Sequence, residues 1–293
     1  MTSSLRTRPA LTRDASFELG SVLAKARGEN FPVASRLLPV RVRRQLLAIY
    51  GFARFVDDVG DLAPGDRLAA LEWAEAELDR ALDGRATHPV FVAAGRLAAE
   101  LGLDRRPFAD LIAANRLDQE VKRYPTWEAL EHYCSLSANP VGRLVLAVFG
   151  QPSAEAAVLS DRICTALQVV EHLQDVREDF AAGRVYLPAE DLARFGVEEA
   201  DLAAAAASPR LRRAVAFEAG RARRLLVAGA PLIGLVPGAG RVAIAGFVGG
   251  GLAQLDALEA AAYDVLARPV KARRAAVARW TVRVALGRGA GSR

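Results

Sequence analysis

Hydrophobic residues recur along most of this chain at the spacing of three and four that places them on one face of a helix. Glycine, proline and polar residues separate the helical stretches, as in GDLAPGDR, DGRATHP, SANP and VPGAG. No convincing strand alternation and no repeat of fixed period accompanies this pattern. The predicted helices are 17–26, 41–58, 66–82, 90–101, 106–118, 127–137, 141–149, 154–180, 209–228 and a last helix from 241 to 268 and onward.

The pattern predicts an all-α fold in which about ten helices form one domain over residues 17–285. Residues 1–16 are predicted to be a flexible arm, and residues 286–293 a disordered tail. The 293 residues are 52% hydrophobic, which is enough for one large core. Aromatic residues make up only 6%, and the abundance of Ala, Leu, Arg and Glu favours helix throughout.

The formal net charge of +5 favours contact with an anion, which leaves nucleic acid, an acidic membrane face and a phosphorylated substrate open. The N-terminal sequence lacks the apolar core of a secretory signal, and the two cysteines form no disulfide or zinc pattern, so we expect a cytoplasmic protein. The apolar stretch 227–255 is interrupted by Pro231, Pro237 and Arg241, whereas a membrane-spanning helix needs roughly 20 apolar residues in succession. We therefore expect buried helices in that region.

Two sets of acidic residues suggest a chemical role. The first acidic set is Asp57, Asp58 and Asp61, and the second acidic set is Asp175, Glu178 and Asp179. On a helix the members of each set fall within about 100° of one another, and the second spacing is the reverse of the first. If the two helices face one another antiparallel, these mirrored spacings form one compact acidic cleft.

Both sets follow mostly apolar segments, which indicates cleft carboxylates that need partners. Hard divalent cations offset the repulsion within each set, and Mg2+ typically takes one or two carboxylates while water and substrate phosphates complete its shell. The pattern therefore predicts Mg2+ between the sets and a phosphorylated substrate; the alternative is a pair of solvated acidic helix faces. Arg54, four residues before Asp58, would neutralise these acids or bind a phosphate.

Three stretches, LLAIYGFARFVDDVGD, YCSLSANPVGRLVL and LQVVEHLQDVREDFAAGRVYLP, resemble the squalene/phytoene synthase family of head-to-head prenyl synthases. The resemblance covers roughly residues 17–275. It implies an isoprenoid synthase fold around a central hydrophobic cavity, with Mg2+ held by both acidic sets. The diphosphate of an isoprenoid substrate would be bound and ionised there.

The resemblance also implies further site residues, matched position by position. Tyr50 and Arg54 match the residues before the first acidic set, Gln168 opens the second motif, and Tyr133 and Gly142 match the helix that crosses the cavity. Arg184 and Tyr186 match a GRxYLP tail that binds substrate, and Arg268 matches a late diphosphate-binding arginine.

Three departures resemble one branch of this family, the hydroxysqualene synthases of the bacterial route to squalene and hopanoids. Asn30 and Pro32 replace serines at a substrate-binding segment, Glu171 and Gln174 replace Asn and Arg, and Asn139 and Pro140 replace Ala and Gly. This branch adds water to presqualene diphosphate and releases hydroxysqualene and diphosphate. We hypothesise that Glu171, His172 and Asn139 position the water or accept its proton; the alternative is an ion-paired Glu171 and a satisfied helix histidine.

Other functions stay open from the sequence alone. One is direct synthesis of squalene, dehydrosqualene or phytoene from two prenyl diphosphates, and another is a non-catalytic helical scaffold. No dinucleotide fingerprint follows a strand, so we expect no reduction by this chain. Nucleic-acid binding is disfavoured, because the basic residues are not interleaved with aromatic ones.

The C-terminal stretch RPVKARRAAVARWTVRVAL is basic and partly apolar. With Trp280 and Val284 it would touch the anionic inner face of a membrane, where a lipidic product must leave. The alternative is a terminal helix packed on the domain. The resemblance further implies functional coupling to a presqualene diphosphate synthase.

Overall fold

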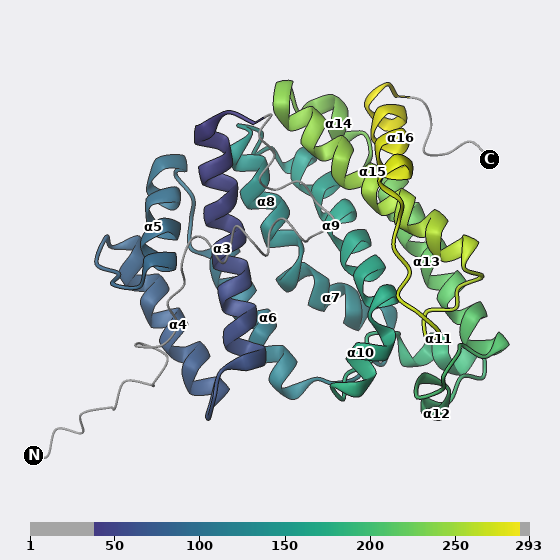
Figure 1. Cartoon of the computed structure of the whole chain (residues 1–293). Helices are drawn as coiled ribbons and strands as arrows, with labels where there is room; N and C mark the ends of the chain where they lie inside the picture. Colours follow the sequence, from purple (N-terminus) through teal and green to yellow (C-terminus); the bar gives the residue numbers. More distant parts are fainter. Residues whose placement is uncertain (1–37, 288–293) are drawn as a thin grey trace, which may run out of the picture.

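The structure is a computed structural model that describes residues 38–287 (Figure 1). Its longer helices are α3 Val40–Leu62, α4 Arg67–Leu82, α5 Pro89–Leu101, α6 Arg106–Glu120, α7 Trp127–Ser137, α8 Asn139–Val148, α9 Ala154–Gln174, α13 Pro209–Gly229, α15 Gly238–Ala260 and α16 Arg274–Ala285. Its short helices are α10 Val176–Ala181, α11 Ala189–Arg194, α12 Glu199–Leu202 and α14 Leu232–Leu235. The predicted all-α class is confirmed. The predicted arm 1–16, helix 17–26 and most of the tail lie outside the described residues.

Side-chain caps explain why several predicted helices begin where they do. The side chains of Asp66, Thr126, Ser153 and Ser208 each accept a hydrogen bond from the backbone N–H three residues later, at 3.1 to 3.3 Å. Such caps satisfy backbone donors that a helix start leaves without a partner. The helices α4, α7, α9 and α13 therefore begin within one residue of the prediction.

Two predicted helices are wrong in their length. The helix predicted over 154–180 breaks at Asp175, which ends α9 and precedes α10. The helix predicted from 241 through 268 ends at Ala260, because Ala262 and Tyr263 take left-handed φ angles of 50° and 57°. An irregular segment then leads to α16.

An aromatic cluster forms the core of the half built from α3 to α6. Phe52 meets Phe91 and Phe108 edge to face, with ring centroids 5.4 and 5.1 Å apart. In the other half α16 packs closely along α15, since a Cβ on Gly249 would lie 2.5 Å from the backbone nitrogen of Thr281. Among the described helices α15 alone is long and apolar enough to span a membrane, and 61% of its most apolar window is buried inside the protein.

The helices that carry the acidic sets run in the same direction, with α8 antiparallel between them (Figure 1). The antiparallel arrangement considered from the sequence is therefore wrong. The acids nevertheless approach one another, because α3 and α9 both end at the same end of the bundle.

Candidate functional site

The first acidic set occupies the last two turns of α3, and α6 fixes its position. Asn115 Nδ2 donates to Asp57 Oδ1 at 2.9 Å, and Gln119 Nε2 donates to the Gly60 carbonyl at 3.0 Å. A Cβ at position 60 would lie 2.3 Å from Asn115 Oδ1, so a larger residue there would displace the Asn115 side chain that holds Asp57. Asp57 is exposed to solvent, yet many protein atoms surround its carboxyl group, and the resulting desolvation raises its pKa to about 6.

Two arginines hold the other acids of the first set. Arg54 Nε lies 3.0 Å from Asp58 Oδ1 within the same helix. The terminal guanidinium nitrogen of Arg184 donates to Asp61 Oδ1 at 2.6 Å, although the two residues are far apart in the sequence. The Arg184 side chain is only 16% exposed, so this pair ties the segment after α10 to the end of α3.

The second acidic set surrounds the break between α9 and α10. The Asp179 N–H donates to the Asp175 carbonyl at 2.7 Å and starts the short helix. Burial, with the neighbouring charges of Asp179 and Glu178, raises the pKa of Asp175. Within residues 38–287 no arginine or lysine lies within ion-pair distance of this set; His172 Nδ1, at 3.9 Å from Asp179 Oδ2, is the nearest base.

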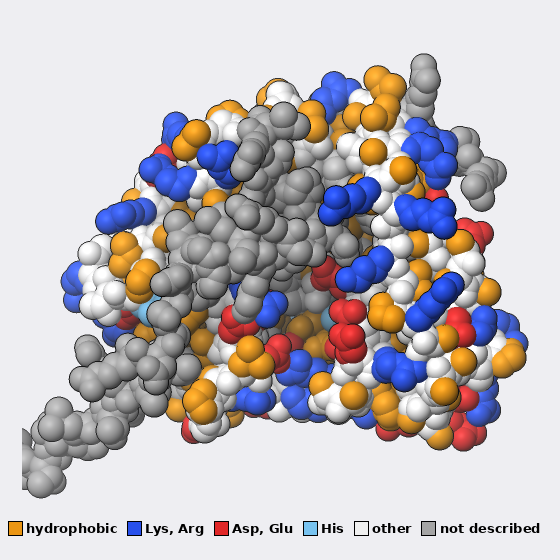
Figure 2. Space-filling view, viewed as in Figure 1, with side chains coloured by type: hydrophobic (Ala, Val, Ile, Leu, Met, Phe, Trp, Pro, Cys, Tyr) orange, Lys and Arg blue, Asp and Glu red, His pale blue; other side chains and the backbone are white. Residues whose placement is uncertain are grey.

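The two sets flank a hollow on one face of the molecule. Figure 2 shows acidic side chains over the end of α3 on one side of it and over α10 on the other, with basic side chains below. The positive charge of Lys271 also acts on Asp175 and lowers its pKa, which opposes the increase caused by burial and by Asp179 and Glu178.

Aromatic rings and a buried carboxylate lie next to the acids. Tyr133 and Tyr186 donate their hydroxyls to the two oxygens of Asp118, at 2.6 and 3.0 Å. His172 stacks on Tyr186, with centroids 3.8 Å apart and planes 10° apart. Gln168 Nε2 lies 3.3 Å from His172 Nε2. Burial raises the pKa of Asp118, which is 8% exposed.

Sequence reasoning missed Asp118 and Asn115. A signal was present, because Asn115, Asp118 and Gln119 share the spacing of the second acidic set on a helix that also carries buried Leu111 and Ile112. Polar groups on the buried stripe of a helix require partners, and here these partners are site residues.

The structure gathers most of the predicted site residues around the hollow. Arg54, Tyr133, Gln168, His172, Arg184 and Tyr186 join the acidic sets through the contacts above, and Tyr50 lies one turn before Arg54 on α3. Asn139 is 5% exposed, and its Oδ1 accepts from Thr165 Oγ1 at 3.1 Å, one turn before Gln168. Asn30 lies outside the described residues.

Arg268 lies on the irregular segment between α15 and α16. It lines a pocket beside α15 together with Asp256 and Lys271, and the charge of Lys271 reaches Asp175. A diphosphate contact of Arg268 stays a prediction.

The donors fit a metal ion shared with a substrate better than one held by protein alone. No three Asp, Glu, His or Cys side chains of the described part converge on one ion position. The two acidic sets supply only carboxylate oxygens, the ligand type of Mg2+, which commonly takes one or two of them and completes its shell with phosphates and water.

Acidic helix ends that face one another, arginines within reach of the same hollow and an aromatic wall beside it suit one kind of chemistry. A leaving diphosphate needs positive charge, and the cation that it leaves behind needs apolar and aromatic surroundings. This combination, on an all-α bundle, is that of an isoprenoid synthase.

The chain belongs to the squalene/phytoene synthase family, whose model matches residues 24–281. Enzymes of this family act on prenyl diphosphates. A hydroxysqualene synthase of Rhodopseudomonas palustris is 40% identical to this chain, and the match covers 70% of each protein. A hydroxysqualene synthase of Sinorhizobium fredii is 38% identical, and the match covers 73% of each protein. A phytoene synthase of Arthrospira platensis is 33% identical over 74% of this chain and 75% of its own. The crystal structure of squalene synthase HpnC from Alicyclobacillus acidocaldarius is 43% identical, with a TM-score of 0.76 over 84% of this chain and 94% of that chain.

Proposed function

We propose that this chain is a hydroxysqualene synthase, which converts presqualene diphosphate and water to hydroxysqualene and diphosphate. The observation that carries the proposal is its similarity to two relatives of that name, at 38 to 40% identity, against 33% for the phytoene synthase. The carboxylate of Glu171, one turn before Asp175, adds support, because water that captures a carbocation must lose a proton.

The same proposal includes Mg2+ as the cofactor. Asp57, Asp58 and Asp61 would hold it on one side, and Asp175, Glu178 and Asp179 on the other. Bound there with the substrate, it would neutralise the developing charge of the leaving diphosphate. Arg54 and Arg184, which now pair with Asp58 and Asp61, are placed to exchange these carboxylates for phosphate oxygens.

Aromatic rings would hold the cation after the carbon–oxygen bond breaks. Tyr133, Tyr186 and His172 form a stacked cluster, and the ring faces that this stacking leaves uncovered would offer negative electrostatic potential to the cation. Asp118 accepts both tyrosine hydroxyls, so it orients the rings and keeps the phenol oxygens directed away from the cation. Gln168 of α9 and Asn139 of α8, which accepts a hydrogen bond from Thr165 one turn before Gln168, would orient substrate and water.

Product analysis tests the proposal. The protein is incubated with presqualene diphosphate and Mg2+, with and without NADPH, and separately with farnesyl or geranylgeranyl diphosphate alone. We expect hydroxysqualene from presqualene diphosphate, with no need for NADPH. A hydrocarbon or a presqualene product from a prenyl diphosphate alone would favour the alternative, a squalene, dehydrosqualene or phytoene synthase. No turnover of any substrate would favour the remote alternative of a non-catalytic scaffold.

We also propose peripheral contact with the inner face of the membrane for a cytoplasmic enzyme, but through different residues from those expected. Trp280 and Val284 are buried, and Trp280 Nε1 donates to Asp256 Oδ2 at 2.7 Å, so they contribute nothing to an outer surface. Val242, Val282 and Leu286 are 58 to 62% exposed instead. Arg241 joins the start of α15 to the end of α16 by donating to the Ala285 carbonyl at 2.9 Å, which brings these three residues to one end of the helix pair.

Sedimentation with anionic liposomes tests this contact. The double variant Val282→Ser and Leu286→Ser should bind several-fold more weakly than the wild type, because apolar insertion is lost while the net charge is unchanged. Val158→Ser, another exposed apolar position on a different helix, is the control. Equal binding by the double variant would exclude this end of α16 as the contact.

Functional coupling to a presqualene diphosphate synthase belongs to the proposal as well, since its product is the expected substrate. A coupled assay with both enzymes and farnesyl diphosphate should give hydroxysqualene, and omission of this chain should leave presqualene diphosphate. Hydroxysqualene formed without this chain would contradict the assignment.

A further inference from the structure

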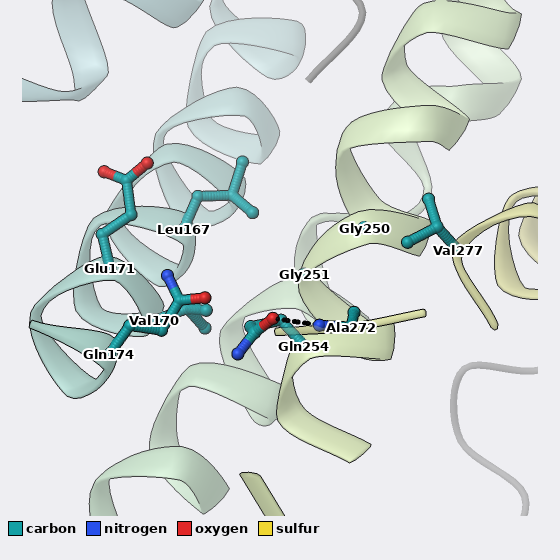
Figure 3. Close-up of a pocket in the computed structure, with 9 residues that line it drawn as sticks. All are labelled: Leu167, Val170, Glu171, Gln174, Gly250, Gly251, Gln254, Ala272 and Val277. Atoms are coloured by element: carbon teal, nitrogen blue, oxygen red, sulfur yellow. Dashed lines mark hydrogen bonds between the residues drawn. The ribbon is translucent and has the colours of Figure 1, made fainter. Parts of the chain in front are cut away.

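A small, partly open pocket lies between α9 and α15, and its lining includes Gln174, the residue before Asp175 (Figure 3). Its volume is about 40 Å³. A water molecule needs roughly 10–15 Å³, together with two to four polar partners, so the pocket has room for about three waters. Glu171 and Gln174 line it from α9, and Gln254 lines it from α15.

Gln254 gives this pocket a fixed polar wall. The residue is 4% exposed; its Oε1 accepts from the Ala272 N–H at 2.8 Å, and its Nε2 donates to the Val270 carbonyl at 2.7 Å. These two bonds hold the segment between α15 and α16 in place, and Ala272 from that segment closes the pocket. An amide has a second N–H and a second lone pair, so Gln254 retains hydrogen-bonding capacity for water.

The position of Gln174 connects the pocket to the chemistry. It is the residue immediately before Asp175, and Figure 3 shows its amide and that of Gln254 projecting toward the same space. Glu171 lines the same pocket one turn earlier on α9, and its carboxylate is directed away from the two amides and exposed to solvent. A water held between the two amides therefore lies beside the residue that precedes Asp175, in a pocket that a base also lines.

We propose that this pocket stores the water that captures the carbocation, with Gln174 as a positioning residue and Glu171 as the proton acceptor. The inference rests on the proposed function. The carbon–oxygen bond of the diphosphate ester breaks with its electron pair on the departing diphosphate. A lone pair of the stored water forms the new carbon–oxygen bond, and the proton of that water passes to the Glu171 carboxylate. No atom is oxidised or reduced.

Two substitutions separate water supply from ionisation of the substrate. Gln174→Leu keeps the side-chain size but removes both hydrogen-bonding groups, and Ala272→Leu fills the pocket from the opposite wall. Gln151→Leu, the same change at a half-buried position that does not line the pocket, is the control. Thermal melting of each variant shows whether it is folded before product is measured.

We expect diphosphate release from presqualene diphosphate to stay within about threefold of wild type in both variants, while the hydroxysqualene share of the product falls about tenfold, since a well-ordered water has been displaced. Gln151→Leu should keep the wild-type share. An unchanged hydroxysqualene share in both folded variants overturns the inference. If the wild-type protein itself forms no hydroxysqualene, the proposed function fails. The wild-type reaction therefore separates failure of the proposed function from failure of the inference about the pocket.

A crystal structure of the wild-type protein provides a readout that does not depend on turnover. We expect at least one ordered water bonded to the amides of Gln174 and Gln254, absent in Ala272→Leu. A dry pocket in the wild type contradicts the inference.

Discussion

The two acidic sets differ in how the protein compensates their charge. In the first set Asp58 and Asp61 pair with Arg54 and Arg184, at the end of an uninterrupted helix that α6 clamps through Asn115. The second set surrounds a helix break, and in residues 38–287 it has no arginine or lysine at ion-pair distance. Two of the three acids of the first set are thus preformed as ion pairs, whereas the second set keeps an excess of negative charge among the described residues.

This difference assigns different tasks to the two sides of the cleft. On the α3 side, an incoming Mg2+ and diphosphate would replace internal ion pairs, so the arginines become available to the phosphates at the same time. On the α9 side, a cation would relieve a repulsion that the folded protein already contains. Substitutions in the two sets should therefore have the same effect on activity and opposite effects on stability.

The largest expected effect is on turnover. Asp61→Asn and Asp175→Asn should each lower kcat by about a thousandfold, because a metal-supported leaving group is worth several kcal/mol in the transition state. Glu72→Gln, an exposed acid on α4 and remote from the cleft, is the matched control and should keep wild-type kcat. Loss of activity in only one of the two aspartate variants would contradict the prediction that both acidic sets are needed for turnover.

The next effect concerns pH. Because Asp57 has a pKa of about 6, the free enzyme loses this carboxylate ligand as the pH falls through that value. We expect kcat/KM to fall about tenfold for each pH unit below 6, since it reports the free enzyme. A kcat/KM profile that is flat from about pH 5 to pH 7 would contradict a role for Asp57 in metal binding.

A third prediction compares these acids with Asp118, whose two oxygens are both satisfied by tyrosines. Tyr133→Phe removes one of the two hydrogen bonds to a buried carboxylate and should lower the free energy of unfolding by about 1–3 kcal/mol. Tyr124→Phe is the control, because the Tyr124 hydroxyl is buried without a hydrogen-bond partner among the described residues. Chemical denaturation measures both, and equal destabilisation would show that Asp118 does not depend on this bond.

The smallest effect is also the sharpest test of the difference between the sets. Without metal at neutral pH, Asp175→Asn should raise Tm and Asp61→Asn should lower it, each by about 2 °C because both side chains are open to solvent. The pKa of Asp175 is raised, so its proton favours the folded state at low pH and that contribution is lost as the pH rises through the raised pKa. The gain of Asp175→Asn should therefore disappear in acid. If both variants change Tm in the same direction at neutral pH, the proposed difference in charge compensation between the two sets is wrong.

The sequence could predict whatever depends on local periodicity and capping. Predicted starts of α4, α7, α9 and α13 are accurate because a capping side chain stands at each. The acidic sets were also identified in advance, because their spacing is a local property of helices, whereas the residues matched around them came from the family resemblance.

The remaining features depend on contacts between residues that are distant in the sequence. The bond between Arg184 and Asp61 joins positions 123 residues apart, and Asp118 becomes a site residue only through Tyr133 and Tyr186. Helical periodicity continues through Asp175 and through Ala262, so neither break was visible before the fold was known. For the same reason the influence of the Lys271 charge on Asp175 could not be predicted from the sequence.

Binding of inorganic diphosphate, measured by calorimetry with and without Mg2+, tests the central claim most directly. The account predicts that wild-type protein binds diphosphate tightly only with Mg2+, and that Asp61→Asn and Asp175→Asn each weaken this binding at least tenfold. Diphosphate binding that is equally tight without Mg2+, or that is unchanged in Asp175→Asn, would contradict a shared metal site between the two acidic sets.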